Sequence, residues 1–67
     1  MRIAEVLLPL GALPEPFDYA APDDMEIAVG DHVVVPLGPR EIRSVVCSLR
    51  DGTGHNRPLK EVLGVID

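Results

Sequence analysis

The sequence is poor in the residues that small domains use as covalent or metal-bound supports. Its 67 residues include one cysteine, Cys47, two histidines and no tryptophan. A single cysteine excludes an internal disulfide and a zinc cluster of cysteines, which commonly stabilise scaffolds of this size. A chain this short also builds no more than one core. We therefore expect residues 1–67 to form a single domain held together by apolar packing.

Residues that support catalysis are equally scarce. The histidines are His32 and His55, the serines are Ser44 and Ser48, and no local signature joins a nucleophile to a base. There is no Gly-x-x-x-x-Gly-Lys phosphate loop, so an ATPase or kinase activity cannot reside in these residues. The acidic residues between positions 23 and 26 lack the spacing of a calcium loop. The sequence predicts no catalytic residue and no metal site.

Positive charge is in short supply as well. Six lysines and arginines stand against eleven aspartates and glutamates, which gives a net charge of −5. A surface of this sign repels phosphate, so composition argues against a general nucleic-acid binder. Glu5 and Pro9 interrupt the amino-terminal apolar run well short of a signal peptide or a membrane span. We expect a cytoplasmic protein with no membrane partner.

Turn-forming residues, in contrast, are abundant. Seven prolines and six glycines favour short strands over long helices. Apolar and β-branched runs predict five strands, at 2–8, 17–20, 33–35, 41–49 and 59–66. The fourth run also has apolar residues at helical spacing, but Val45-Val46 and the turn signal at 51–54 favour a strand.

Proline and glycine positions define the expected strand ends and irregularities. Prolines at 9, 14 and 16 are expected to prevent regular pairing until Phe17, and Pro36 is expected to end the third strand. Gly64 is expected to mark either a bulge or a site of close approach in the last strand. An open five-stranded sheet would expose two edges, and curling the sheet reduces that exposure. The expected fold is all-β, a small antiparallel β-barrel of about five short strands with proline-rich loops.

The chain's only phenylalanine and only tyrosine flank one carboxylate in the segment Phe17-Asp18-Tyr19. Two interpretations stay open. In the first, both rings pack in or beside the core and Asp18 accepts a hydrogen bond from a nearby backbone N–H. In the second, a ring stacks on a nucleobase while the carboxylate accepts a hydrogen bond from a sugar hydroxyl or a base amino group. Such a pocket would bind the end of a strand and not a run of phosphates.

Several spaced motifs in one register carry a resemblance to a known family. They are Phe17-Asp18-Tyr19-x-x-Pro22, then Met25-x-Ile27-x-x-Gly30-x-x-Val33-x-Val35-Pro36-Leu37-Gly38, then Arg40 and a valine-rich strand. Together they closely resemble the amino-terminal domain of the bacterial replication-restart helicases of the primosomal protein N′ (PriA) family. The likeness runs nearly from Ile3 to Asp67 and includes the closing Leu59-Lys60-Glu61-Val62 and Val65-Ile66-Asp67.

The resemblance implies sequence-independent binding of the 3′ end of the nascent leading strand at a stalled replication fork. The positions it implies for DNA 3′-end binding are Phe17, Asp18, Tyr19, Gly38 and Lys60, with Arg40 as a weaker candidate. Gly38, lacking a β-carbon, lets a nucleotide approach the backbone. Lys60, the only lysine, supplies a cation for the last phosphate or a base acceptor. One or two such cations suffice for a single terminal nucleotide despite the net negative charge.

The sequence departs from the family pattern at two positions. Leu37 stands where relatives commonly carry an aromatic residue, so any stacking from that position is missing. Ser44 stands near a usual glycine in the fourth strand, which affects only the expected local strand geometry. Neither position belongs to the implied 3′-end site.

The resemblance also implies partners and a larger parent protein. The family joins this domain to a winged helix, two helicase lobes and a zinc region, so ATP and zinc are expected only in those absent parts. The parent is expected to be an ATP-dependent 3′→5′ DNA helicase, with the remaining helicase domains and primosome proteins as partners. The alternative is a protein-interaction β-barrel whose edge strands and acidic surface bind a partner chain and whose aromatic residues are structural.

Overall fold

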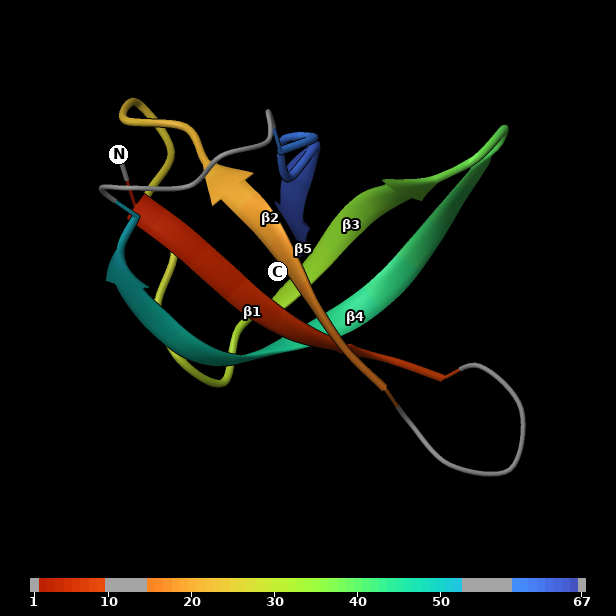
Figure 1. The fold of residues 1–67 in the computed structure, drawn as a ribbon, viewed down its shortest axis with the longest axis horizontal. Helices are drawn as coiled ribbons and strands as arrows, with labels where there is room; N and C mark the ends of the chain where they lie inside the picture. The colour runs from red at the N-terminus through yellow and green to blue at the C-terminus, as the bar shows by residue number, and fades with distance from the viewer. Residues whose placement is uncertain (1, 10–14, 53–58, 67) are drawn as a thin grey trace.

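The computed structural model describes residues 2–9, 15–52 and 59–66, and its regular elements are all strands. They are β1 Arg2–Leu8, β2 Glu15–Ala21, β3 His32–Leu37, β4 Arg40–Asp51 and β5 Gly64–Ile66 (Figure 1). None of the described residues is helical. The all-β prediction is therefore confirmed, and the ambiguous fourth segment is a strand.

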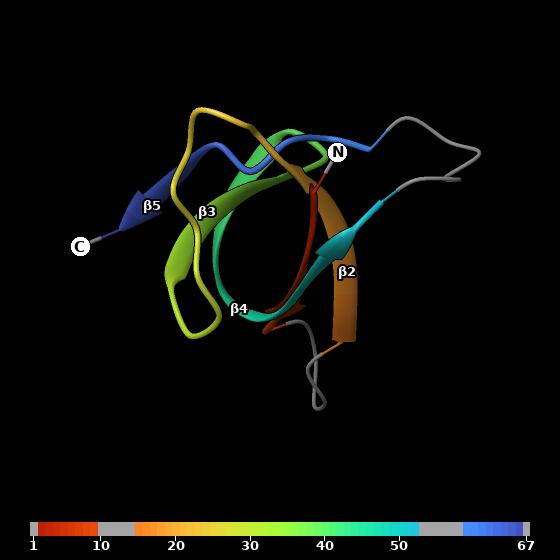
Figure 2. The ribbon, with the colours of Figure 1, turned by 90° about the vertical axis from the view of Figure 1, so that its left-hand side faces the viewer.

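The five strands form one sheet in the order β2-β1-β4-β3-β5, with antiparallel pairing throughout. Figure 2 shows the sheet curling so that its inner face encloses the core. The sheet does not close by a ladder between its edge strands β2 and β5. The expected barrel is thus a curled open sheet.

The segment just before β5 partly bridges the two sides of this opening. The Ala20 N–H donates to the Lys60 carbonyl at 2.9 Å, and the Val62 N–H donates to the Ala20 carbonyl at 3.0 Å. One residue further, the Leu63 N–H donates to the Val34 carbonyl at 2.8 Å. The predicted fifth strand was consequently too long, because the chain contacts β2 at 60–62 before it pairs with β3 as β5.

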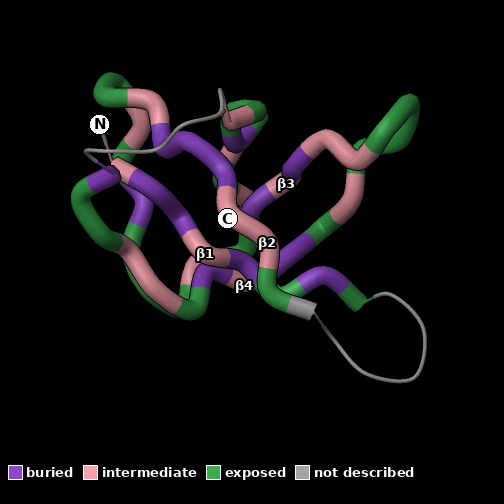
Figure 3. The backbone as a smooth tube through the Cα atoms, in the orientation of Figure 1, coloured by how far each residue is buried: buried purple, intermediate pink, exposed green. Residues whose placement is uncertain are grey.

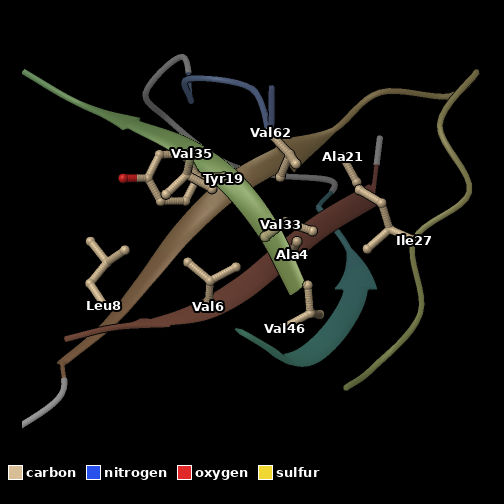
Figure 4. Packing of buried hydrophobic residues seen from close by; sticks show 10 residues of the cluster. All are labelled: Ala4, Val6, Leu8, Tyr19, Ala21, Ile27, Val33, Val35, Val46 and Val62. Carbon is tan, nitrogen blue, oxygen red and sulfur yellow. The ribbon is translucent and has the colours of Figure 1, made fainter. Parts of the chain in front are cut away.

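The core lies on the inner face of the curl, as the alternation of side chains along the strands requires. Figure 4 draws ten of its members, which come from β1 to β4 and from the connecting segments: Ala4, Val6, Leu8, Tyr19, Ala21, Ile27, Val33, Val35, Val46 and Val62. Full burial of a valine or leucine side chain contributes about 1.5–3 kcal/mol. In Figure 3 the buried segments follow the strand centres, whereas the turn between β3 and β4 is exposed. Apolar burial therefore concentrates where the strands face one another.

Two prolines lie inside strands, contrary to the expectation that they would end pairing. Pro16 is opposite Leu7 in β2, and Pro36 is opposite Glu41 in β3. The backbone N–H and carbonyl of Ala20 point away from β1 and bond Lys60 and Val62, respectively. In an antiparallel ladder these groups point alternately toward and away from the neighbouring strand, so Pro16, four residues earlier in β2, also points away from β1. Pro36 has no partner in β5, which pairs only with 32–34. Both prolines thus lie where no ladder N–H is required.

A β-bulge divides β4. Glu5 is opposite Ser48 while the next residue, Val6, is opposite Val46, so Cys47 is the extra residue on β4. The bulge turns both Cys47 and Ser48 away from the core and returns Leu49 to it. The bulge predicted at Gly64 is not the one found, since the register shift falls between β1 and β4.

Some expectations concern positions outside the described residues. They are the proline-rich stretch at 10–14, the turn at 53–54 and His55. Over the described part of the chain, no helix is long and apolar enough to cross a membrane.

Candidate DNA 3′-end site

The predicted aromatic segment lies in β2, an edge strand, so its side chains alternate between the two faces of the sheet. Phe17 and Tyr19 face inward: Phe17 is half-buried and packs against the core, and Tyr19 is only 4% exposed. Asp18 lies opposite Glu5 and bonds Arg50 on the outer face. The two rings and the carboxylate between them are therefore on opposite faces of one edge strand.

Tyr19 connects two strands that share no ladder. Its hydroxyl donates a hydrogen bond of 2.8 Å to the carbonyl of Pro36 in β3. Burial raises the pKa of the Tyr19 hydroxyl above its ordinary value of 10.0. The core-packing interpretation thus describes Tyr19, whose hydroxyl reaches the carboxyl end of β3 where the predicted Gly38 follows.

Gly38 and Arg40 belong to the hairpin between β3 and β4. Gly38 and Pro39 form its two-residue turn, and Leu37 pairs with Arg40. Gly38 has φ +58°, whereas proline is fixed at a negative φ, and this combination is that of a type II′ turn. Apart from Gly38 itself and its two chain neighbours, no described residue has an atom within 4 Å of the position that a β-carbon on Gly38 would take. The backbone at Gly38 is therefore open to a ligand, beside the exposed Arg40.

Lys60 lies beside the same edge of β2. Its carbonyl accepts a hydrogen bond from the N–H of Ala20, one residue beyond Tyr19, and Lys60 is exposed. Backbone hydrogen bonding therefore places the chain's only lysine next to the aromatic segment. The structure brings Phe17, Tyr19 and Lys60 to one edge, with the Gly38 hairpin linked to it through Tyr19, and turns the Asp18 side chain to the other face.

The outer face beside Asp18 carries a charged group that sequence reasoning missed. Arg50 Nη2 donates to Asp18 Oδ2 at 2.6 Å, and Arg50 Nη1 lies 3.9 Å from Glu5 Oε2. The hydrogen bond to Asp18, followed by the charges of Asp18 and Glu5, raises the pKa of Arg50. Because the two residues are 32 positions apart, only the register of β2, β1 and β4 reveals the pair.

The bulged Cys47 lies on this face as well. Its thiol donates to the Glu5 carbonyl with an Sγ–O distance of 3.2 Å. Cys47 is exposed, and partial loss of hydration of its thiol, together with the hydrogen bond and negative charge of Glu5, raises the pKa of Cys47. A raised pKa favours the protonated thiol over the thiolate.

Two hollows lined by described residues lie elsewhere. The lining residues of the first are Arg2, Asp23, Leu49, Arg50 and Asp51, and those of the second are Ala20, Ala21, Pro22, Asp23 and Glu61. Neither is lined by any of the six predicted 3′-end residues. Within the described ranges, no group of three or more histidine, cysteine or acidic residues is arranged to hold a metal ion.

Comparison with known proteins places the chain in a family. Residues 5–67 match the family model described as 3'DNA-binding domain (3'BD). The chain is 47% identical to the replication restart protein PriA of Rickettsia conorii over 73% of this chain, and 33% identical to that of Bacillus subtilis over all of it. It is 43% identical to that of Rickettsia prowazekii over 92% of this chain. These alignments span only 7–9% of the relatives' own lengths.

The chain folds as a curled five-stranded sheet, and the 3′ DNA-binding domain model matches nearly the whole chain, so this is a DNA-binding module. The chain belongs to the 3′ DNA-binding domain family of the replication restart protein PriA.

Proposed function

We propose that this domain binds the 3′ end of the nascent leading strand at stalled replication forks, without regard to base sequence. The observation that supports this most directly is the family match to a 3′ DNA-binding domain over residues 5–67. The convergence of Phe17, Tyr19 and Lys60 on one sheet edge adds a structural argument. An edge strand can be approached from both faces, so one terminal nucleotide can contact residues that alternate along it.

Each proposed residue has a role that its position permits. Phe17, the half-buried ring, provides a partly exposed face on which the terminal base stacks. Tyr19 forms the wall behind it and holds β2 to β3 through Pro36. The Asp18 carboxylate accepts a hydrogen bond from the free 3′-hydroxyl on the outer side of the same strand.

The remaining roles concern the backbone and phosphate of the nucleotide. At Gly38 the open space allows the nucleotide to approach the main chain closely. Lys60 provides the cation for the last phosphate, and Arg40 lies at the end of the hairpin as a second cation. Two local cations are sufficient for one terminal nucleotide, so the net charge of −5 does not prevent binding.

The expected affinity is low. One base stack contributes about 1–3 kcal/mol, and one hydrogen bond to a charged group contributes about 1.5–3 kcal/mol. Their sum of roughly 3–6 kcal/mol corresponds to dissociation constants from several millimolar to some tens of micromolar. Duplex contacts made by other parts of a longer protein would supply the rest.

A titration with short single strands tests end recognition. Oligonucleotides that end in a 3′-hydroxyl are compared with the same oligonucleotides that end in a 3′-phosphate. The phosphate removes the hydroxyl donor and adds negative charge beside Asp18, so weaker binding is expected. The same change at the 5′ end serves as the control and is expected to have a smaller effect. Equal affinity for the two 3′ ends would remove the proposal.

A pair of charge variants tests the location of the site. Lys60→Gln removes one exposed positive charge beside β2 and is expected to weaken binding. Arg43→Gln removes one exposed positive charge on β4, opposite Val34, and is expected to leave binding nearly unchanged. Equal losses would indicate general electrostatics and not a site. No response of the domain to DNA at all would favour the alternative, a protein-interaction module.

The activity of the longer protein is part of the same proposal. We infer that residues 1–67 form one domain of an ATP-dependent 3′→5′ helicase, which other domains and primosome proteins join at the fork. ATP and zinc would then bind outside these residues, and this domain would contribute DNA binding but no catalysis. The supporting fact is that the matched relatives, named replication restart protein PriA, are more than ten times longer than the aligned segment.

A further inference from the structure

Arg50 forms a hydrogen bond with the carboxylate at the centre of the proposed site. Its Nη2 donates to Asp18 Oδ2 at 2.6 Å, and both side chains remain partly exposed, at 42% and 27%. Hydrogen bonds between ionised partners are short and orient both groups. The Asp18 carboxylate is therefore held in place by a side chain two strands away in the sheet.

The β-bulge explains how Arg50 comes to face Asp18. With the bulge, Arg50 is opposite Ile3, and Asp18 is opposite Glu5, two residues further along β1 on the same outer face. If Cys47 instead paired with Glu5 in a regular ladder, the register at Val6 would continue and place Arg50 opposite Arg2. Its side chain would then alternate to the inner face. The bulge therefore places the Arg50 side chain where it can cross β1 to reach β2.

Asp18 is the preferred partner of Arg50 on this face. The distance from Arg50 Nη1 to Glu5 Oε2 is 3.9 Å, which is beyond hydrogen-bond range, whereas the bond to Asp18 is short. The hydrogen bond to Asp18 is also the main cause of the raised pKa of Arg50. Glu5 is consequently a natural control for a general effect of charge on this face.

We propose that Arg50 is a positioning residue for recognition of the DNA terminus. It keeps the Asp18 carboxylate oriented at the β2 edge, so that the carboxylate meets the 3′-hydroxyl without first being ordered. A carboxylate has about four acceptor sites, so the bond to Arg50 is compatible with a second donor. Ordering the acceptor in advance lowers the cost of binding. This inference rests on the proposed 3′-end function.

The test compares two DNA ends in variants of the whole domain. Affinity is measured for one oligonucleotide with a 3′-hydroxyl and for the same oligonucleotide with a 3′-deoxy end. A hydrogen bond to the charged carboxylate corresponds to a preference of about tenfold to a hundredfold for the hydroxyl end in the unmodified domain. Arg50→Gln is expected to reduce that preference at least threefold, and Arg50→Lys, which keeps the charge, to restore part of it.

Two controls separate positioning from charge and from stability. Arg43→Gln causes the same charge change elsewhere on β4, and Glu5→Gln removes the neighbouring carboxylate, which lies 3.9 Å from Arg50, beyond hydrogen-bond range. Both variants are expected to keep the full preference. Thermal melts of all variants should lie close together, because exposed ion pairs contribute little to folding. Arg50→Lys remains informative if Arg50→Gln folds poorly.

The outcomes distinguish the two proposals. If the unmodified domain prefers the hydroxyl end and Arg50→Gln preserves that preference, the positioning role is wrong and the proposed function stands. If Arg50→Gln binds the hydroxyl end more tightly, Arg50 competes with DNA for Asp18, which also overturns the inference. If the unmodified domain shows no preference between the two ends, the proposed function itself fails.

Discussion

Replacement of Tyr19 by phenylalanine tests what holds the opening of the curled sheet. The substitution keeps a ring of the same size in the core and removes only the hydroxyl that donates to the Pro36 carbonyl at 2.8 Å. Because β2 and β3 are not neighbours in the sheet, this bond joins strands that have no ladder between them. The variant therefore isolates one cross-sheet interaction without creating a cavity.

The expected cost follows from the environment of the bond. A hydrogen bond between neutral groups contributes about 0.5–1.5 kcal/mol net. Pro36 is half-buried, so water can replace part of the lost donor and the upper end of that range is not expected. A loss of about 1 kcal/mol lowers the melting temperature of a 60–100-residue domain by about 4–8 °C.

The pH dependence of stability supplies a second measurement of the same contact. Burial raises the pKa of Tyr19 above its ordinary value of 10.0, so the unfolded chain releases this proton at a lower pH than the folded domain. The stability contributed by protonated Tyr19 is complete below pH 10 and is lost as the pH rises through the folded-state pKa. Tyr19→Phe lacks this loss, so the stability difference between the two proteins should narrow above pH 10.

Denaturant melts at a series of pH values measure both effects, and tyrosinate absorbance follows the group directly because the chain has one tyrosine. DNA affinity at low temperature should change less than about twofold, since the hydroxyl is engaged within the protein. An unchanged melting temperature combined with a tenfold loss of DNA affinity would show that this role of the Tyr19 hydroxyl is wrong. The hydroxyl would then be a DNA contact and not a connection between strands.

Two further predictions concern single positions in β4 and its hairpin. Gly38→Ala places a residue with a β-carbon at φ +58° in open space, so we expect a stability loss of about 1–2 kcal/mol from backbone strain alone. Urea melts should show a smaller loss of stability for Gly38→Asn, because asparagine tolerates positive φ better than alanine. Equal losses for the two variants would argue against strain. Ser44→Ala removes a buried hydroxyl whose Oγ has no hydrogen-bond partner among the described residues. The stability of the domain should therefore stay equal or rise by about 1 kcal/mol. A marked fall in the urea midpoint would show that the hydroxyl has a partner.

Local patterns predicted most of the fold. The apolar residues of β1 predicted its bounds of Arg2–Leu8, and Val45-Val46 correctly favoured a strand for β4. The fifth strand was predicted too long because the apolar run from 59 to 66 is continuous in sequence. Tertiary hydrogen bonds divide this run, since the Val62 N–H bonds β2 and the Leu63 N–H bonds β3. No local pattern contains that information.

The candidate site was only partly accessible from the sequence. The motif resemblance selected Phe17, Asp18 and Lys60, and their contribution to DNA binding stays a prediction. Alternation along β2 already implied that Phe17 and Asp18 would face opposite ways once a strand was assigned. Arg50 was not found because its contact with Asp18 depends on the bulge at Cys47, which shifts the register by one residue. A bulge inside an unbroken strand pattern leaves no clear trace in the sequence.

Chemical-shift mapping with a dinucleotide that carries a free 3′-hydroxyl would locate the DNA-binding site on the domain. Binding in the millimolar to micromolar range suits this measurement, which reports every backbone amide at once. The proposed location of the 3′-end site predicts the largest shifts at Phe17, Asp18, Gly38 and Lys60, with Val29, on an exposed loop, unaffected. Saturating dinucleotide that leaves these four amides unmoved, or shifts confined to another part of the domain, would contradict it.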